Sequence, residues 1–306
     1  MARRKKKKLN SKGRKAAIIA LLSLMGMLIL VTCWAALNAN TLNVMRAEVY
    51  VEDLPAAFEG VRLLYLTDID LCGINTAKKS AAAVARLQSL SPDMLILGGD
   101  YTSVHLFELL NRSENAQFSE KQLNERRSFF QYISGFSAPL GKYALITPDD
   151  AEGELLSRQM IESGFMSLTE IVPIERNSER IYLIPDSRIG EAAGSFSRRD
   201  CVICAAPSPE SFPALMTAEA SGGGHVVDLA LAGHTHGGQI RLFGRNVLSL
   251  TAREQQYLSG WSRETGVPML TSSGLGCEGA NLRIGSRAEA WIITLTSKNP
   301  EEEAQS

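Results

Sequence analysis

The feature that most restricts the fold of this chain is an uncharged segment close to its N-terminus. Residues 16–37, AAIIALLSLMGMLILVTCWAAL, carry no charged side chain, and about 20 apolar residues in a helix are enough to cross a bilayer. The 15 residues before this segment hold nine lysines and arginines and no acidic residue. We therefore predict a single-pass helix in the cell membrane, with the N-terminus cytoplasmic and the remaining chain extracytoplasmic.

Two other interpretations of this segment stay open. A cleaved signal peptide usually has a shorter apolar region and a small-residue cleavage site, and neither is present here. Cys33, in the stretch LVTC, loosely matches a lipid-attachment motif, but Thr32 is a poor residue in front of such a cysteine. We expect the helix to be retained as the membrane anchor.

The sequence divides into five parts. We expect a basic cytoplasmic segment at 1–15, a transmembrane anchor at 16–37, a linker at 38–48, one folded domain at 49–297 and a disordered tail at 298–306. Since nine of the 32 basic residues precede the anchor, the folded domain is acidic although the whole chain has a net charge of only −1. An acidic domain argues against nucleic acid as a partner.

The five cysteines do not form the pattern of a disulfide framework, because their number is odd and their spacing is sparse. Cys201 and Cys204 make a C-x-x-C pair, but they lie in an apolar run that is typical of a strand. Two residues three positions apart on a strand point to opposite faces. We therefore expect these two cysteines to serve in packing.

Apolar runs alternate with amphipathic helices through the folded domain, which predicts an α/β fold. Buried strands are expected within 61–70, 93–100 and 225–236, and helices within 76–90, 119–136 and 154–165. Each of the three strands ends in acidic or imidazole side chains, in TDID, GGD and GHTHGG. Oxygen and nitrogen ligands of this kind suit Mn²⁺, Fe or Zn²⁺, and the glycines beside them allow close approach of the backbone.

With these motifs in this order, the chain resembles the calcineurin-like metallophosphoesterases, and most closely their small membrane-bound bacterial branch. The resemblance runs from about Val49 to Leu295, and its best stretches are LPAAFEGVRLLYLTDIDLCG, PDMLILGGDYT, PLGKYAL, LAGHTHGGQIRLFG and SSGLG. It implies a β-sandwich flanked by helices on both outer faces (αββα), here preceded by one transmembrane helix. It also implies two metal ions bridged by an aspartate and the hydrolysis of phosphate esters.

The residues that the family uses for its first metal are largely kept. The D-x-H motif corresponds to Asp68 and Asp70, so that a carboxylate stands in place of the family's histidine. The G-D motif keeps its bridging Asp100, and the second histidine of G-H-x-H is His236. Four hard or borderline ligands favour Mn²⁺ or Mg²⁺ over Fe or Zn²⁺.

The second metal site has lost two of its ligands. It would keep the bridging Asp100 and His234, the first histidine of G-H-x-H. The asparagine of the family's G-N-H-[DE] motif has become Pro148 in TPDD. A further histidine aligns with Pro207, within one residue of register. Since proline has no side-chain donor atom, we expect one metal ion rather than two.

The family's catalytic histidine corresponds to Asp149, a weak candidate for a general acid, which would contribute a factor of about 10² to 10⁴ in rate. His105 and His225 are expected at the surface. Arg241, Arg245 and Arg283 are weaker candidates for contacts with a phosphate near the mouth of the site.

Two functions from different classes follow from these observations. The first is a membrane-anchored hydrolase with one divalent metal ion, acting on a phosphoester that is lipid-linked or part of the cell envelope. The second is a pseudoenzyme that binds a phosphate-containing ligand or a protein partner in the same cleft. The substrate in the first case rests on location and on analogy with the family.

Overall fold

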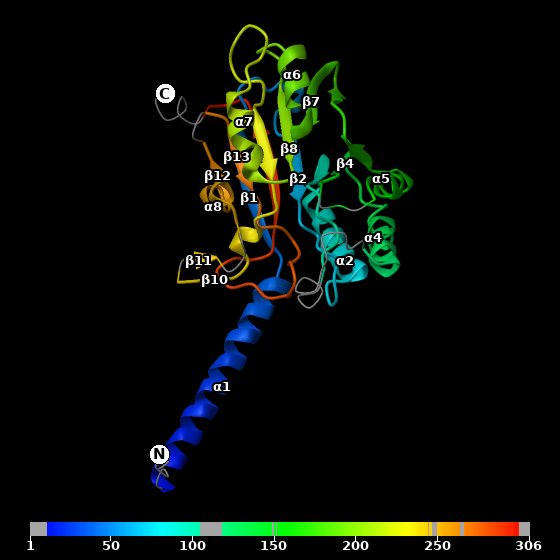
Figure 1. Cartoon of the computed structure of the whole chain (residues 1–306). Helices are drawn as coiled ribbons and strands as arrows, with labels where there is room; N and C mark the ends of the chain where they lie inside the picture. Colours follow the sequence, from blue (N-terminus) through cyan, green and yellow to red (C-terminus); the bar gives the residue numbers. More distant parts are fainter. Residues whose placement is uncertain are drawn as a thin grey trace, which may run out of the picture.

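The computed structural model describes residues 11–104, 118–148, 150, 152–243, 245–246, 250–263 and 266–299. A long helix, α1 (Ser11–Asn40), leads into a domain built around two six-stranded sheets (Figure 1). Within the described residues, α1 is the helix that has the length and composition to cross a membrane, over Lys12–Asn40. Its large apolar side chains are exposed, Leu37 for example by 65%, as expected for a surface that faces lipid.

The predicted linker at 38–48 is wrong. Helix α1 continues to Asn40, and strand β1 (Asn43–Tyr50) begins three residues later. β1 pairs in parallel with β14 along its whole length, from Asn43 opposite Glu289 to Tyr50 opposite Thr296. The segment is therefore part of a sheet, so that only two residues separate the helix from the folded domain. The predicted tail lies mostly at 300–306, outside the described residues.

The first sheet contains the strands that precede two of the predicted ligand loops. In spatial order its strands are β1, β14 (Glu289–Thr296), β2 (Arg62–Leu66), β3 (Met94–Leu97), β4 (Lys142–Leu145) and β5 (Met166–Leu168). β2, β3 and β4 are parallel to one another, while β14 runs antiparallel to β2. The carboxyl ends of β2 and β3 therefore lie at the same end of the sheet as the start of β1.

The second sheet carries the strand that leads into GHTHGG. In spatial order its strands are β12 (Gly260–Ser262), β13 (Met269–Thr271), β9 (Leu229–Ala232), β8 (Val202–Ala206), β7 (Glu179–Pro185) and β6 (Val172–Arg176). β13, β9, β8 and β7 are parallel, and β12 and β6 are antiparallel edge strands. A separate two-stranded hairpin joins β10 (Arg241–Leu242) to β11 (Arg245–Asn246).

The two sheets pack face to face, and alternation along each strand sets the layers. Leu63 and Tyr65 of β2 face the core between the sheets, whereas Leu64 and Leu66 face a second core on the outer side. Burial of both faces explains why the strand sequences are apolar without interruption. Cys201 lies in the central core and Cys204 in an outer one, so these free cysteines are on opposite faces, as predicted.

Helices cover both outer faces, which confirms the predicted αββα sandwich. The first sheet is covered by α2 (Ala77–Arg86), α4 (Glu120–Tyr132) and α5 (Gly153–Glu162). The second is covered by α6 (Ile189–Ser195) and α7 (Phe212–Thr217), with the short α8 (Ala252–Gln256) beside the site. Single-turn 3₁₀ helices occur at η1 (Ala56–Phe58), η2 (Leu87–Leu90), η3 (Asp186–Arg188), η4 (Pro209–Ser211) and η5 (His236–Gly238).

Asp228, at the end of β9 far from the ligand loops, should make stability depend on pH. Its carboxylate accepts a 2.7 Å hydrogen bond from the Val202 amide, and burial raises its pKa to about 7. The folded chain thus holds this proton more tightly than the unfolded chain, whose aspartate pKa is about 4. The contribution of this group to the free energy of unfolding therefore falls as pH rises from about 4 to about 7.

We predict that Asp228→Asn, which keeps an acceptor oxygen but no charge, stabilises the protein by about 1 kcal/mol or more near pH 8. Near pH 4 the variant and the parent should have the same stability. Thermal unfolding of the full chain in detergent, followed by circular dichroism at both pH values, measures the difference. An equal difference at both values would contradict the assignment of this titration to Asp228.

Candidate metal site at the strand ends

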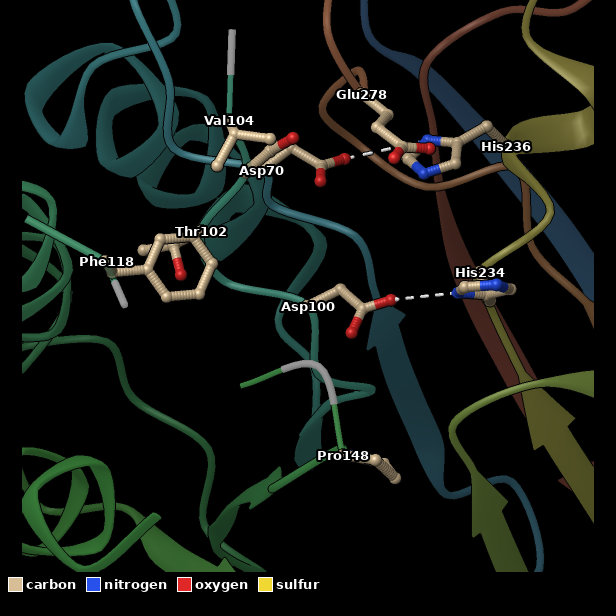
Figure 2. A pocket seen from close by; sticks show the side chains of 10 residues that line it. Asp70, Asp100, Thr102, Val104, Phe118, Pro148, His234, His236 and Glu278 are labelled. Atoms are coloured by element: carbon tan, nitrogen blue, oxygen red, sulfur yellow. Dashed lines mark hydrogen bonds and ion pairs between the residues drawn. The ribbon is translucent and has the colours of Figure 1, made fainter. Parts of the chain in front are cut away.

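The predicted ligands come together where strands of the two sheets end. Asp70 and Asp100 follow β2 and β3, and His234 and His236 follow β9. All four line one cavity of about 300 Å³, and Figure 2 shows the two carboxylates facing the two imidazoles across it. The remaining lining residues are Thr102, Ser103, Val104, Phe118, Pro148 and Glu278. Asp68 is fully buried beneath, with one oxygen accepting the His234 amide at 2.9 Å.

The five predicted ligands share a backbone conformation that is uncommon for residues other than glycine. The φ angles are 51° at Asp68, 48° at Asp70, 54° at Asp100, 74° at His234 and 51° at His236. Non-glycine residues in this left-handed region carry strain that the surrounding structure must hold in place. Backbone bonds do so here: the Asp70 amide donates to the Asp100 carbonyl at 3.0 Å, and the Asp68 amide to Gly99 at 3.1 Å. Strain gathered at these positions is typical of a functional site.

Glycine is required next to the buried aspartate. Gly274 follows β13, has a φ of 72°, and lies so near Asp68 that an added Cβ would come within 2.5 Å of its Oδ2. An added Cβ at Gly233 would come within 2.8 Å of the same oxygen. Two loops that follow strands of the second sheet thus close tightly around one carboxylate that follows a strand of the first, which explains the SSG and AGH sequences at these positions.

Asp68, Asp70 and His236 form the first half of the site. Within the described part of the chain, Asp68 Oδ2, Asp70 Oδ2 and His236 Nδ1 are buried without a hydrogen-bond partner. Asp70 Oδ2 and His236 Nδ1 lie 3.6 Å apart, too far for a hydrogen bond. Burial, together with the charge of the neighbouring aspartates, raises the pKa of Asp68 and Asp70 well above the usual range. Burial, aided by the Arg283 charge, lowers the pKa of His236 to about 3.

Asp100 and His234 belong to a second half in which the side chains are paired within the protein. Asp100 Oδ1 accepts a 2.7 Å hydrogen bond from the Thr147 hydroxyl, and its Oδ2 lies 3.4 Å from His234 Nδ1. Burial would raise the pKa of Asp100, but these two hydrogen bonds outweigh it and lower the pKa. The bond to Asp100 also raises the pKa of His234 to about 9, against the effect of burial.

Glu254 is a member of this half that the sequence did not reveal. Its Oε1 lies 3.4 Å from His234 Nε2 and accepts a bond from the Ser208 hydroxyl at 3.4 Å. Its other oxygen accepts the Thr251 amide at 2.7 Å, in a capping box that begins α8. The T-x-x-E pattern signals the start of a helix, but only the packing of α8 brings the carboxylate to His234. Ser208 lies within the register where the family has its missing histidine.

The stretch TPDD reaches the site through three of its residues. Pro148 lines the cavity near Asp100 (Figure 2) and offers no donor atom. Asp150 is buried and accepts bonds from the Thr147 and Tyr101 amides at 3.0 and 3.1 Å. Burial, followed by the charge of Asp100, raises its pKa to about 7. Asp149, the predicted general acid, lies outside the described residues, as does His105, whereas His225 is exposed, as predicted.

Glu278 is a second residue that the sequence analysis missed. Its side chain lines the cavity beside Asp70 and His236 (Figure 2), and its charge contributes to the raised pKa of Asp70. Its loop is held by Gln239, whose side chain accepts the Glu278 amide and donates to the Glu278 carbonyl, both at 2.9 Å. The last residue of GHTHGGQ therefore positions an additional carboxylate at the cavity.

Arg283 does not meet a phosphate at the mouth of the site, which corrects its suggested role. Its side chain is fully buried and donates hydrogen bonds to backbone carbonyls of three loops. The accepting carbonyls are those of His236 at 3.1 Å, Ser273 at 2.7 Å, Gly274 at 3.3 Å, Gly276 at 2.6 Å and Arg287 at 3.2 Å. Among the described residues that line the cavity, neither Arg241 nor Arg245 is found.

We predict that Arg283→Lys lowers the free energy of unfolding by about 2–4 kcal/mol, because a lysine ammonium has fewer donors and leaves buried carbonyls unsatisfied. Chemical denaturation of the full chain in detergent measures the loss. Arg245→Lys, at an exposed arginine, is the matched control and should be neutral. A stable Arg283→Lys variant would show that these loops are held by other contacts.

Comparisons with known proteins find two curated relatives that are named as metallophosphoesterases. No protein-family model matches the chain. A transmembrane protein with metallophosphoesterase domain from Danio rerio is 26% identical over 270 residues, which are 83% of this chain and 57% of that protein. The chain thus spans 57% of the length of this relative. The uncharacterized metallophosphoesterase YkuE of Bacillus subtilis (strain 168) is 22% identical over 258 residues, 80% of this chain and 82% of that protein.

Among solved structures, the Pseudomonas putida nuclease MPE is 14% identical, with a TM-score of 0.31, over 71% of this chain and 78% of that one. This similarity is too low to say anything of the activity of the present chain. The αββα sandwich and its carboxylate and imidazole loops define a scaffold of the phosphoesterase class. Together with the two curated relatives, which are named as metallophosphoesterases, they support a relationship of the chain to the calcineurin-like metallophosphoesterase family, whose members depend on divalent metal ions.

Proposed function

We propose that this protein is a membrane-anchored phosphoester hydrolase that uses one divalent metal ion, held by Asp68, Asp70, Asp100 and His236. The observation that carries the proposal is the set of unpartnered buried atoms in the first half of the site. Within the described residues, two carboxylate oxygens and one imidazole nitrogen, from three different predicted ligands, are buried without hydrogen bonds. Leaving such atoms unsatisfied is costly, so they are expected to have a partner outside the chain.

The donor chemistry of these residues fits a divalent ion. Asp70 Oδ2 and His236 Nδ1 are 3.6 Å apart, so a small movement of either side chain would bring both within reach of one ion. The low pKa of His236 keeps its imidazole neutral, as a metal ligand must be. No group of three His, Cys, Asp or Glu side chains in the described residues is already closed around one point, so binding requires small side-chain movements.

One ion is favoured over two because the polar side-chain atoms of Asp100 and His234, which would hold a second ion, already have partners within the protein. Both oxygens of Asp100 have partners in Thr147 and His234, and His234 lies between Asp100 and Glu254. Pro148 stands where the resemblance places the asparagine ligand. We propose Mn²⁺ or Mg²⁺, because carboxylates outnumber imidazoles in the first half.

When bound, the ion supplies Lewis acidity toward the phosphoryl group and toward water. The chain contributes the shape and polarity of the cavity. Thr102 Oγ1 is buried without a hydrogen-bond partner in the described structure and lines the cavity, so its hydroxyl can donate to a phosphate oxygen. Phe118 and Val104 form an apolar wall beside it (Figure 2). We assign no general acid among the described residues.

The loss of second-site ligands favours one alternative, a pseudoenzyme that binds a phosphate-containing ligand or a protein partner in the same cavity. Pro148 and the paired state of Asp100 support this alternative as well as the one-ion hydrolase. The two proposals differ in whether ester hydrolysis depends on the metal ligands. Nucleic acid is disfavoured as substrate in both, because the folded domain is acidic.

We further propose that α1 anchors the domain outside the cytoplasmic membrane. Support comes from the exposed apolar surface of α1, from the basic residues at its N-terminal end and from the transmembrane relative in zebrafish. The positive-inside rule then leaves the N-terminus in the cytoplasm and the cavity on the other side. A lipid-linked phosphoester is the substrate class that this location favours.

We predict one Mn²⁺ ion per chain after the full-length protein in detergent is loaded with Mn²⁺ and separated from free ion. Elemental analysis by mass spectrometry gives the ratio. His236→Ala should lose the ion, whereas the control His225→Ala, at an exposed histidine far from the cavity, should keep it. No ion in the parent protein would overturn the one-metal proposal, and two ions would show that other groups replace the lost ligands.

We predict that Asp100→Asn lowers Mn²⁺-dependent hydrolysis of bis(p-nitrophenyl) phosphate by about a hundredfold or more, because the ion loses one of its charged ligands. Asp228→Asn, remote from the cavity, should retain the parent rate. Circular dichroism and thermal unfolding show whether each variant is folded. A parent protein that binds the ion but hydrolyses neither mono- nor diesters would favour the pseudoenzyme.

A further inference from the structure

The ligand-bearing end of the domain is also the end from which α1 leaves. β1 begins three residues after α1 ends. Because β14 is parallel to β1 and antiparallel to β2, the loops after β2 and β3 lie at this same end. Figure 1 shows α1 leaving the domain below the β10–β11 hairpin, with the C-terminal strand end on the far side. The strand order thus places the cavity at the membrane side of the domain.

The domain is fastened to the last turns of α1 without a spacer. The Arg283 amide donates to the Ala35 carbonyl at 3.0 Å, and the Asn38 side chain donates to the Arg283 carbonyl at 3.4 Å. Ala35 and Ala39 are buried against the domain. Since Ala35 lies within the uncharged segment, the loop that carries Arg283 must sit at the level of the bilayer interface once α1 spans the membrane.

The β10–β11 hairpin is bonded to this same loop and carries exposed apolar side chains. Ile240 bridges to Ile284, and the Arg241 amide donates to the Ile284 carbonyl at 2.8 Å. At the tip, Phe243 is fully exposed and Leu242 is 48% exposed. An aromatic residue held out in water at a hairpin tip has an unfavourable environment unless another phase or a partner covers it.

Helix α2 lies on the other side of the end of α1 from the β10–β11 hairpin (Figure 1), and another exposed apolar residue precedes it. Ile74, in the loop between β2 and α2, is 66% exposed. The following helix is tied to α1, because Lys79 Nζ donates to the Asn40 side chain. Basic side chains accompany both places: Arg241 and Arg245 in the hairpin, and Lys79 beside Ile74. Apolar tips flanked by cations match the interface of a bilayer that contains anionic lipids.

We propose that Leu242, Phe243 and Ile74 form a membrane-facing surface that inserts into the headgroup region of the bilayer spanned by α1. The occupant of this surface is lipid, because the helix that must lie in the bilayer leaves the domain between the two apolar places. Arg241, Arg245 and Lys79 contact anionic headgroups. The cavity is then held at headgroup depth, and the phosphoester of an interfacial lipid is the substrate class that reaches it; this last consequence alone rests on the proposed hydrolase function.

The test uses the full chain with a photoreactive benzophenone amino acid in place of Phe243, reconstituted in vesicles of phosphatidylcholine and phosphatidylglycerol in equal parts. Tyr132, which is 59% exposed at the end of α4 remote from the ligand loops, is the matched control, and Ile74 is the second test position. Mass spectrometry after irradiation identifies lipid adducts. We expect several-fold more lipid adduct at positions 243 and 74 than at position 132.

Equal labelling at positions 243 and 132, or adducts between two copies of the chain in place of lipid adducts, would overturn the membrane-facing surface. Vesicles in which phosphatidylcholine replaces phosphatidylglycerol should give a lower adduct yield at position 243. In an Arg241→Gln, Arg245→Gln double variant, the yield should stay low even when phosphatidylglycerol is present. None of these readouts requires catalytic activity. A failure of the hydrolase proposal is therefore distinguishable from a failure of this one.

Discussion

The buried guanidinium of Arg283 is the interaction on which the arrangement of this end of the molecule depends. Its N–H groups satisfy carbonyls in the GHTHGG loop, in the glycine loop after β13 and in the loop before β14. Its own backbone amide is bonded to α1. Guanidinium is suited to this task because it presents five donors in a fixed plane. One side chain thus couples the membrane helix to both loops that enclose Asp68.

The site divides according to which of its polar atoms are paired. Asp100 and His234 find partners within the protein, in Thr147 and Glu254, so the polar atoms of this half are paired without an ion. Asp68 and Asp70 are both buried, and burial raises the pKa of each; the charge of Asp100 adds to this at Asp68, and the charges of Asp68 and Asp100 add to it at Asp70. A buried pair of carboxylates is stable either when protonated or when a cation joins it. This contrast supports the proposed ion at Asp68 and Asp70 over a second ion at His234.

The short connection between α1 and β1 has consequences that reach the cavity. With only two residues between helix and strand, the domain cannot turn freely relative to α1. β14 is parallel to β1 and antiparallel to β2. The ligand loops after β2 and β3 therefore lie at the end of the sheet where α1 joins β1. The location of the cavity and the anchoring of the chain are therefore one feature of the topology.

Patterns along the chain were enough to predict the apolar N-terminal helix, the α/β class and the loops that line the cavity, and the family resemblance added the sandwich flanked by helices. Those features depend on local patterns: uninterrupted apolar strands, helical periodicity and carboxylates directly after strands such as 61–66 and 93–97. The tertiary structure decided which polar groups meet. Glu254 and Glu278 reach the cavity, and Arg283 is buried away from it, because residues far apart in the chain pack together there. No local periodicity encodes such contacts, since they depend on how the separate loops fold over one another.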